Sequence, residues 1–181
     1  PYLFPMPVLM IATYCEDGSV DVMNMAWGGI CGNNKVALNI TESHKTSKNI
    51  KERGAFTISV ADVPHLEESD YFGTASANRV KDKFEKSGMH AVKSERVDAP
   101  IIEEYPITLE CKVSKIYNDD EGFRVVGEIV NVLVDEEVLD SNGKVDPTKL
   151  NAFVFDQFQN GYYAIGEKVG EAWKSGNKYI K

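Results

Sequence analysis

Two long β-rich segments joined by a short polar loop constrain the fold more than any other feature of the sequence. Ile107–Tyr117 and Phe123–Val134 are dominated by β-branched and aromatic residues. Residues 118–122 between them read Asn-Asp-Asp-Glu-Gly, which is turn-forming chemistry. The pattern predicts a long antiparallel hairpin that forms the backbone of a barrel.

Shorter strands precede this hairpin. Val8–Tyr14 is an apolar run, and the turn residues 16–19 allow Val20–Asn24 to return beside it as a second hairpin. Val36–Ile40 and Ala55–Val60 have the composition of further strands. Two more short strands are expected near the end of the chain, at Ala152–Phe155 and Tyr162–Ile165.

Only two short helices are predicted. Lys45–Arg53 is stopped by Gly54, and Asn78–Ser87 is followed by Gly88. Many short strands with few helices favour an antiparallel barrel or sandwich, and hence a mainly β (α+β) fold, over an alternating parallel α/β sheet. The Gly-x-Gly-x-x-Gly of a Rossmann fold is also absent.

Length, charge and hydropathy limit the possible partners. The 181 residues, 43% of them hydrophobic, suit one domain over residues 1–181. A net charge of −8 opposes binding to nucleic acid or to anionic lipid. No apolar run approaches the roughly 18–20 residues that cross a bilayer, and the first residues lack the features of a signal peptide. The sequence therefore predicts a cytoplasmic protein with a small-molecule partner and neither nucleic acid nor membrane.

Motifs of hydrolases and metalloenzymes are missing from the sequence. It contains no His-Glu-x-x-His, no Gly-x-Ser-x-Gly and no P-loop. Cys15, Cys31 and Cys111 are widely spaced and form no Cys-x-x-Cys pair, so they are expected to be reduced thiols. We therefore predict no metal ligands and no catalytic protein side chain.

The segment Asn39–Lys48 is the most informative for function, because a strand runs into a helix whose first turn is basic and rich in hydroxyls. Cations at a helix N-terminus are disfavoured by about 0.3–1 kcal/mol each unless an anion lies among them. Free N–H groups, the Thr46 and Ser47 hydroxyls and the Lys45 ammonium would form a phosphate cradle. The alternative is an ordinary surface helix capped by Ser43.

A second segment, Ser76–Phe84, repeats this pattern with Arg79, Lys81 and Lys83 at the predicted start of the other helix. Arg79 would grip a phosphate in bidentate fashion and Lys83 would act as a point charge. The alternative is a solvated charged face, and Phe84 itself fits the core better than a ligand contact. Two basic helix starts in an acidic protein favour a bound dianion.

The segment Asn24–Gly29 suits the wall of a flavin site. It combines an amide, a small residue, a large aromatic and two glycines that allow the backbone to approach a flat ring. Uncharged amides and backbone groups satisfy the edge of an isoalloxazine, while apolar neighbours bury its face. The alternative is that Trp27 is a core aromatic.

Taken in order, these segments resemble the flavin reductase-like family of FMN-binding split-barrel proteins, which includes the flavoredoxins. The resemblance spans most of the chain. It is carried by Pro7 and the hairpin after it, Asn24-x-Ala26-Trp27, residues 44–50, Phe56–Val60, residues 73–76 and Asp82-Lys83-Phe84.

The resemblance implies an antiparallel Greek-key split β-barrel with a few short flanking helices, and a homodimer with non-covalent FMN near the subunit interface. It places the FMN phosphate among residues 44–47 and the ring near Trp27. Asn78 departs from the family, where Gly is frequent. The implied FMN contacts are Asn24, Met25, Ala26, Trp27, Asn39, Thr41, His44, Lys45, Thr46, Ser47, Ser76, Asn78, Arg79, Lys83 and Phe84.

The function implied is a flavin reductase in which FMN takes hydride from NADH or NADPH and passes electrons to free flavin, a metal centre or a protein. Two alternatives stay open: a flavoredoxin-like carrier that does not turn over nicotinamide, and an oxidase of the pyridoxamine-phosphate oxidase type. Tyr162, Tyr163 and Trp173 are expected in the core or an interface, or else over the flavin or nicotinamide.

Overall fold

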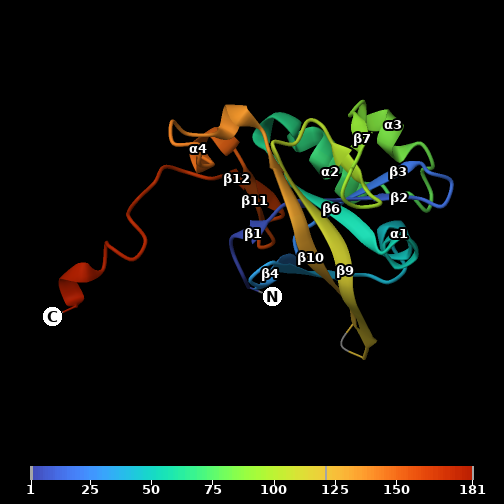
Figure 1. Cartoon of the computed structure of the whole chain (residues 1–181), viewed down its shortest axis with the longest axis horizontal. Helices are drawn as coiled ribbons and strands as arrows, with labels where there is room; N and C mark the ends of the chain where they lie inside the picture. The colour runs from blue at the N-terminus through green and yellow to red at the C-terminus, as the bar shows by residue number, and fades with distance from the viewer. Residues whose placement is uncertain (1, 121, 181) are drawn as a thin grey trace.

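The computed structural model describes residues 2–120 and 122–180, and its centre is a seven-stranded sheet in the order β3-β2-β6-β9-β10-β5-β4 (Figure 1). Every paired strand in it is antiparallel to its neighbour. The strands are β2 Leu9–Tyr14, β3 Val20–Met25, β4 Gly28–Gly32, β5 Lys35–Ile40, β6 Ala55–Val60, β9 Ile107–Asp119 and β10 Gly122–Val134.

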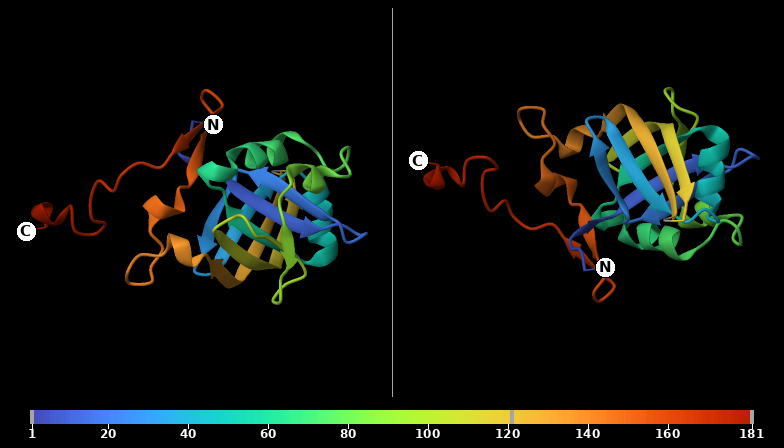
Figure 2. Two further views of the ribbon diagram at one scale, coloured as in Figure 1. Left: turned by 90° about the horizontal axis from the view of Figure 1, so that it is seen from above. Right: turned by 90° about the horizontal axis from the view of Figure 1, so that it is seen from below.

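The way in which the sheet closes follows from one short connection. β3 and β4 form opposite edges of the sheet, yet only Ala26 and Trp27 separate them in sequence. The two edges must therefore meet at this point, so the sheet curls into a barrel, as seen from above and below in Figure 2. Trp27 lies where the two edges meet.

Three helices flank the barrel: α1 Lys45–Arg53, α2 Leu66–Thr74 and α3 Lys83–Ser87. α1 ends at Gly54, whose φ of 65° is left-handed and whose N–H bonds to the carbonyl of Ile50. Within the described part of the chain, no helix is both long and apolar enough to cross a membrane. The remaining helical segments are short: η1 Val63–His65, η2 Glu136–Val138, α4 Pro147–Leu150 and η3 Asn177–Tyr179.

A smaller sheet of β1 Met6–Pro7, β11 Phe153–Asp156 and β12 Gly161–Ala164 stands beside the barrel, in the order β1-β11-β12. β7 Ala91–Lys93 pairs with β8 Pro100–Ile102 on another side. After β12 the chain runs away from the barrel in every view (Figures 1 and 2).

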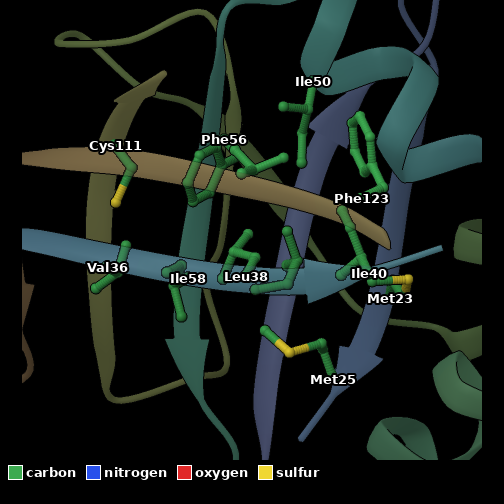
Figure 3. Close-up of a cluster of buried hydrophobic side chains, with 12 residues drawn as sticks. Met23, Met25, Val36, Leu38, Ile40, Ile50, Phe56, Ile58, Cys111 and Phe123 are labelled. Carbon is green, nitrogen blue, oxygen red and sulfur yellow. The ribbon is translucent and has the colours of Figure 1, made fainter. Parts of the chain in front are cut away.

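The core has two main parts. One fills the barrel interior and includes Ile50 of α1, Phe56 of β6 and Leu38 of β5, all fully buried (Figure 3). The other lies between the barrel and helices α2 and α3, where the rings of Phe72 and Phe84 stack 6.1 Å apart. α1 thus belongs to the barrel core, and α2 and α3 cover its outside.

Gly127 of β10 leaves room for the Phe56 ring, since a Cβ atom there would lie 2.4 Å from Phe56 Cζ. We expect Gly127→Ala to lower the free energy of unfolding by about 1–3 kcal/mol through overpacking. Gly29→Ala, also in a strand but with nothing within 4 Å of its Cβ, is the matched control. Equal chemical-denaturation midpoints for the two variants would contradict this packing.

The mainly β prediction and most of the strands are confirmed, and α1 has the bounds that the sequence predicts. The predicted helix Asn78–Ser87 is wrong in its first half. The backbone N–H groups of Arg79 and Val80 both bond to the carbonyl of Ser76, which makes a turn, and α3 begins only at Lys83. The argument from a second basic helix start therefore fails. Glu121, in the loop of the predicted hairpin, lies outside the described residues.

Candidate functional site

Two adjoining cavities lie between β3, the start of α1 and the end of α2. We call them cavity 1, of about 490 Å³, and cavity 2, of about 460 Å³. They share the lining residues Met23, His44, Gly73 and Thr74, so they form one continuous site. Gly73 permits this close approach of α2 to β3, because a Cβ there would lie 3.2 Å from Cβ of Asn24.

Most of the predicted site residues line this site, and they divide between its two ends. Cavity 1 is lined by His44, Lys45, Thr46, Ser76, Asn78, Arg79 and Lys83. Cavity 2 is lined by Asn24, Met25, Ala26, Trp27, Asn39, Thr41 and His44. Ser47 and Phe84 line neither cavity.

Cavity 1 offers an anion-binding surface. Its residues include Lys45 and Arg79, and α1 has no acidic residue in its first turn. His44 is the N-cap residue and makes no side-chain capping hydrogen bond, so the helix start keeps its unpaired N–H groups. Together with the helix dipole, these groups favour a negatively charged ligand.

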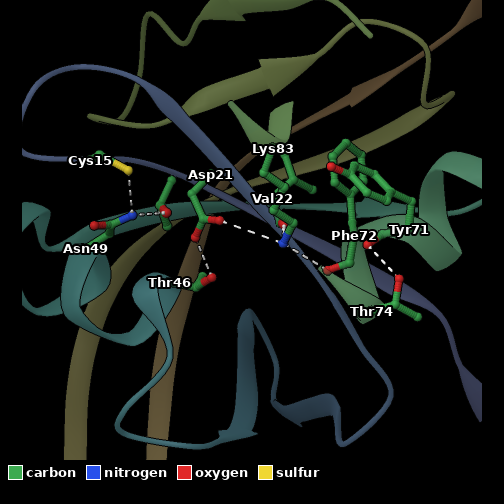
Figure 4. Close-up of polar contacts among 10 residues, drawn as sticks. Cys15, Asp21, Val22, Thr46, Asn49, Tyr71, Phe72, Thr74 and Lys83 are labelled. Atoms are coloured by element: carbon green, nitrogen blue, oxygen red, sulfur yellow. Dashed lines mark hydrogen bonds and ion pairs between the residues drawn. The ribbon is translucent and has the colours of Figure 1, made fainter. Parts of the chain in front are cut away.

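A buried polar network forms the floor of cavity 1 (Figure 4). The Lys83 ammonium donates to the carbonyls of Val22 and Phe72 at 2.7 and 3.0 Å, and it lies 3.9 Å from the carboxylate of Asp21. The Thr46 hydroxyl donates to the same carboxylate at 2.6 Å. Burial lowers the pKa of Lys83, and the charge of Asp21 opposes that shift. The Lys83 ammonium and the Thr46 hydroxyl therefore already have polar partners within the protein.

Three further predicted residues also have partners within the protein. The Ser47 hydroxyl donates to the carbonyl of Thr41 at 2.6 Å and is fully buried. The Asn78 amide donates to the carbonyl of Ser43 at 3.0 Å and ties the 76–82 turn to the start of α1. Phe84 is a core residue. Ser47 and Phe84 therefore support the site without lining it. Asn78 lines cavity 1 and also holds the turn against α1.

Cavity 2 is mainly apolar and aromatic, with amides and the carboxylate of Asp70 among its polar groups. The Trp27 ring lies 6.4 Å from that of Phe155, and its side chain is 48% exposed, so the alternative of a core tryptophan is wrong. The Asn24 amide donates to the carbonyl of Ser69, and the Asn39 amide donates to that of Trp27. Such a cavity fits a flat heteroaromatic ring.

Six residues that line cavity 2 were not predicted as site residues: Met23, Ile40, Asp70, Gly73, Thr74 and Phe155. Tyr162 also lines it, and was expected in the core or an interface, or else over the flavin or nicotinamide. Asp70 lies on α2, a helix that the sequence analysis missed. Two acidic residues in the first turn of α2, Glu67 and Glu68, follow Pro64 closely. This pattern in the sequence indicates the start of a helix. Elsewhere, Tyr163 and Trp173 are exposed and line neither cavity.

Comparisons with known proteins concern the family and the fold of the chain. Residues 2–152 match the family model of the flavin reductase like domain. A flavoredoxin of Desulfovibrio vulgaris (Miyazaki F) is similar at 33% identity and a TM-score of 0.91, over 97% of this chain and 94% of that one. A flavoredoxin from Methanosarcina acetivorans is similar at 25% identity and a TM-score of 0.89, over 98% and 94%.

A protein with a split barrel domain from Shewanella frigidimarina NCIMB 400 superposes with a TM-score of 0.80 at 21% identity, over 92% of this chain and 84% of that one. At this identity the likeness concerns the fold alone. The predicted split barrel is confirmed. Phe155 and Tyr162, which line one wall of cavity 2, lie beyond residue 152, where the family match ends.

Proposed function

The chain belongs to the flavin reductase-like family, as the resemblance of its sequence predicts, and on this premise we propose that it is an oxidoreductase that holds FMN non-covalently. FMN-binding domains characterise this family.

One observation carries the proposal: the site consists of two adjoining cavities, one cationic and hydrogen-bonding, the other mainly apolar and aromatic. FMN has the same two-ended chemistry, with a dianionic phosphate and a flat ring system. The N–H groups at the start of α1, with Lys45 and Arg79, would hold the phosphate. Trp27, Phe155 and the Asn24 amide would surround the ring.

Bound FMN supplies the hydride and electron transfer, so no protein acid or base is required. The residues of the chain bind the cofactor, orient it and exclude water from it. The aromatic side chains of Trp27 and Phe155 cover the ring end, and the Asp21–Thr46–Lys83 network keeps the floor of the phosphate end in place. The proposed reaction therefore assigns no catalytic role to a protein side chain.

We propose that NADH or NADPH reduces the protein, and that the electrons pass to free flavin, a metal centre or a protein. The test is to load the protein with FMN, exclude oxygen, and add either nicotinamide while recording the visible flavin absorbance. We expect the absorbance to bleach with at least one of them. Bleaching by dithionite but by neither nicotinamide would refute the reductase.

A second candidate is a flavoredoxin-like electron carrier without nicotinamide turnover. The similarity to two flavoredoxins at 33% and 25% identity favours it. The same anaerobic titration separates the two candidates, because a carrier binds FMN and is bleached by dithionite alone.

We also propose a homodimer, as the family resemblance implies. The edge strand β4 supports it, because Ile30 on this strand, which closely follows Trp27 in the sequence, is 71% exposed. Sedimentation equilibrium of the FMN-loaded protein tests it, and a mass of one chain at micromolar concentration would refute it.

A further inference from the structure

We propose that Asp70 is a potential-setting residue, whose charge in cavity 2 opposes reduction of the bound flavin and lowers its midpoint potential. The inference rests on the proposed function, because it requires the flavin ring in cavity 2. It concerns a residue of α2 whose proposed effect is electrostatic.

The position of Asp70 is fixed by one hydrogen bond across the cavity wall. The Tyr162 hydroxyl of β12 donates to Asp70 Oδ1 at 2.8 Å, and both residues line cavity 2. The Asn24 amide, bonded to the carbonyl of Ser69, lies next to them on β3. The carboxylate is thus held between a helix, a barrel strand and the smaller sheet.

The surroundings leave this carboxylate without a cationic partner. Within residues 2–120 and 122–180, no ion pair involves Asp70, and it is the one carboxylate among the residues that line cavity 2. Lys45 and Arg79 line the other cavity, and Lys83 is turned to Asp21 and two carbonyls. His44 is the basic side chain that lines both cavities.

The Asp70 carboxylate affects the pKa of the Tyr162 hydroxyl. Burial and the hydrogen bond to Asp70 raise the pKa of Tyr162 to about 12, so the hydroxyl stays protonated and keeps donating. Because a neutral phenol only partly offsets a carboxylate, a net negative field remains at the ring end of the site.

Electrons added to a ring in this cavity add negative charge beside that carboxylate, and like charges repel more strongly in a partly buried site than in water. Asp70→Asn removes the charge while an amide oxygen still accepts from Tyr162. We expect the variant to shift the equilibrium toward reduced flavin by about tenfold or more, which is about 30 mV upward for a two-electron couple. Tyr162→Phe removes the hydroxyl that partly offsets the charge of Asp70, so we do not expect this variant to raise the midpoint potential of the flavin.

The experiment first measures FMN affinity by fluorescence quenching and then the midpoint potential by dye-coupled titration with dithionite. Glu67→Gln is the matched control, because it removes one charge from the same helix at an exposed position outside both cavities. Asp70→Ser, a smaller neutral variant, replaces Asp70→Asn if the latter does not fold. We expect unchanged potentials for Glu67→Gln and raised potentials for the neutral Asp70 variants.

The outcomes separate this inference from the function on which it rests. A wild-type protein that does not bind FMN overturns both. Normal FMN binding with unchanged potentials in the Asp70 variants overturns the role of Asp70 and leaves the proposed function standing. An equal rise in Glu67→Gln also overturns it, because the effect would then come from total charge.

Discussion

Lys83→Met is expected to lower the free energy of unfolding by about 3–5 kcal/mol, because it leaves a buried carboxylate without its cation. The ammonium is buried, donates to the carbonyls of Val22 and Phe72, and lies 3.9 Å from Asp21. Two buried carbonyls also lose their donor. Urea denaturation of the protein without flavin measures the loss.

Lys86→Met is the control for this prediction, since Lys86 lies on the same helix but is exposed and forms an ion pair with the exposed Asp82. We expect its denaturation curve to match that of the wild type. Adding Asp21→Asn to Lys83→Met should restore part of the loss, because the unpaired charge is then removed. A Lys83→Met protein as stable as the Lys86→Met protein would show that Lys83 does not hold this network together.

The second large effect is on cofactor affinity. Replacing Lys45 and Arg79 together by Ala is expected to weaken FMN binding by about 10²–10⁴-fold, because charge-assisted hydrogen bonds contribute about 1.5–3 kcal/mol each. Thr46 is left unchanged in this test, since its hydroxyl binds Asp21 and its loss would lower stability. Equilibrium fluorescence quenching gives the dissociation constants.

Riboflavin, which lacks the phosphate, provides the matched ligand. The double variant should bind riboflavin as the wild type does, and the ratio of the FMN and riboflavin affinities should collapse toward one. Lys48→Ala is the matched variant, because Lys48 lies on the same helix but lines neither cavity. Equal losses of FMN and riboflavin affinity would show that the FMN phosphate does not bind in cavity 1.

The sequence predicts local structure well where one segment contains its own signals. Lys45–Arg53 is recovered residue for residue, because Gly54 supplies the left-handed stop and a strand precedes the helix. Asn78–Ser87 fails because the signal is tertiary. The Asn78 amide bonds to the carbonyl of Ser43, and residues 79 and 80 bond back to Ser76, which replaces the first helical turns.

The prediction of the site residues from the sequence has the same limit. The residue types for both ends of the cavity could be predicted, and most of them line it. The sequence could not show that Lys83 and Thr46 face Asp21, because this carboxylate lies 62 and 25 residues away in the chain and only the packing of α1 and α3 on β3 brings them together. Asp70 was missed because α2 was not predicted.

One wall of the ring end is built from β11 and β12, which follow the segment that carries the barrel. The residues that line cavity 1 and this wall of cavity 2 therefore come from separate stretches of the sequence. A substitution at Phe155 or Tyr162 therefore changes the wall of cavity 2 without altering any residue that lines cavity 1.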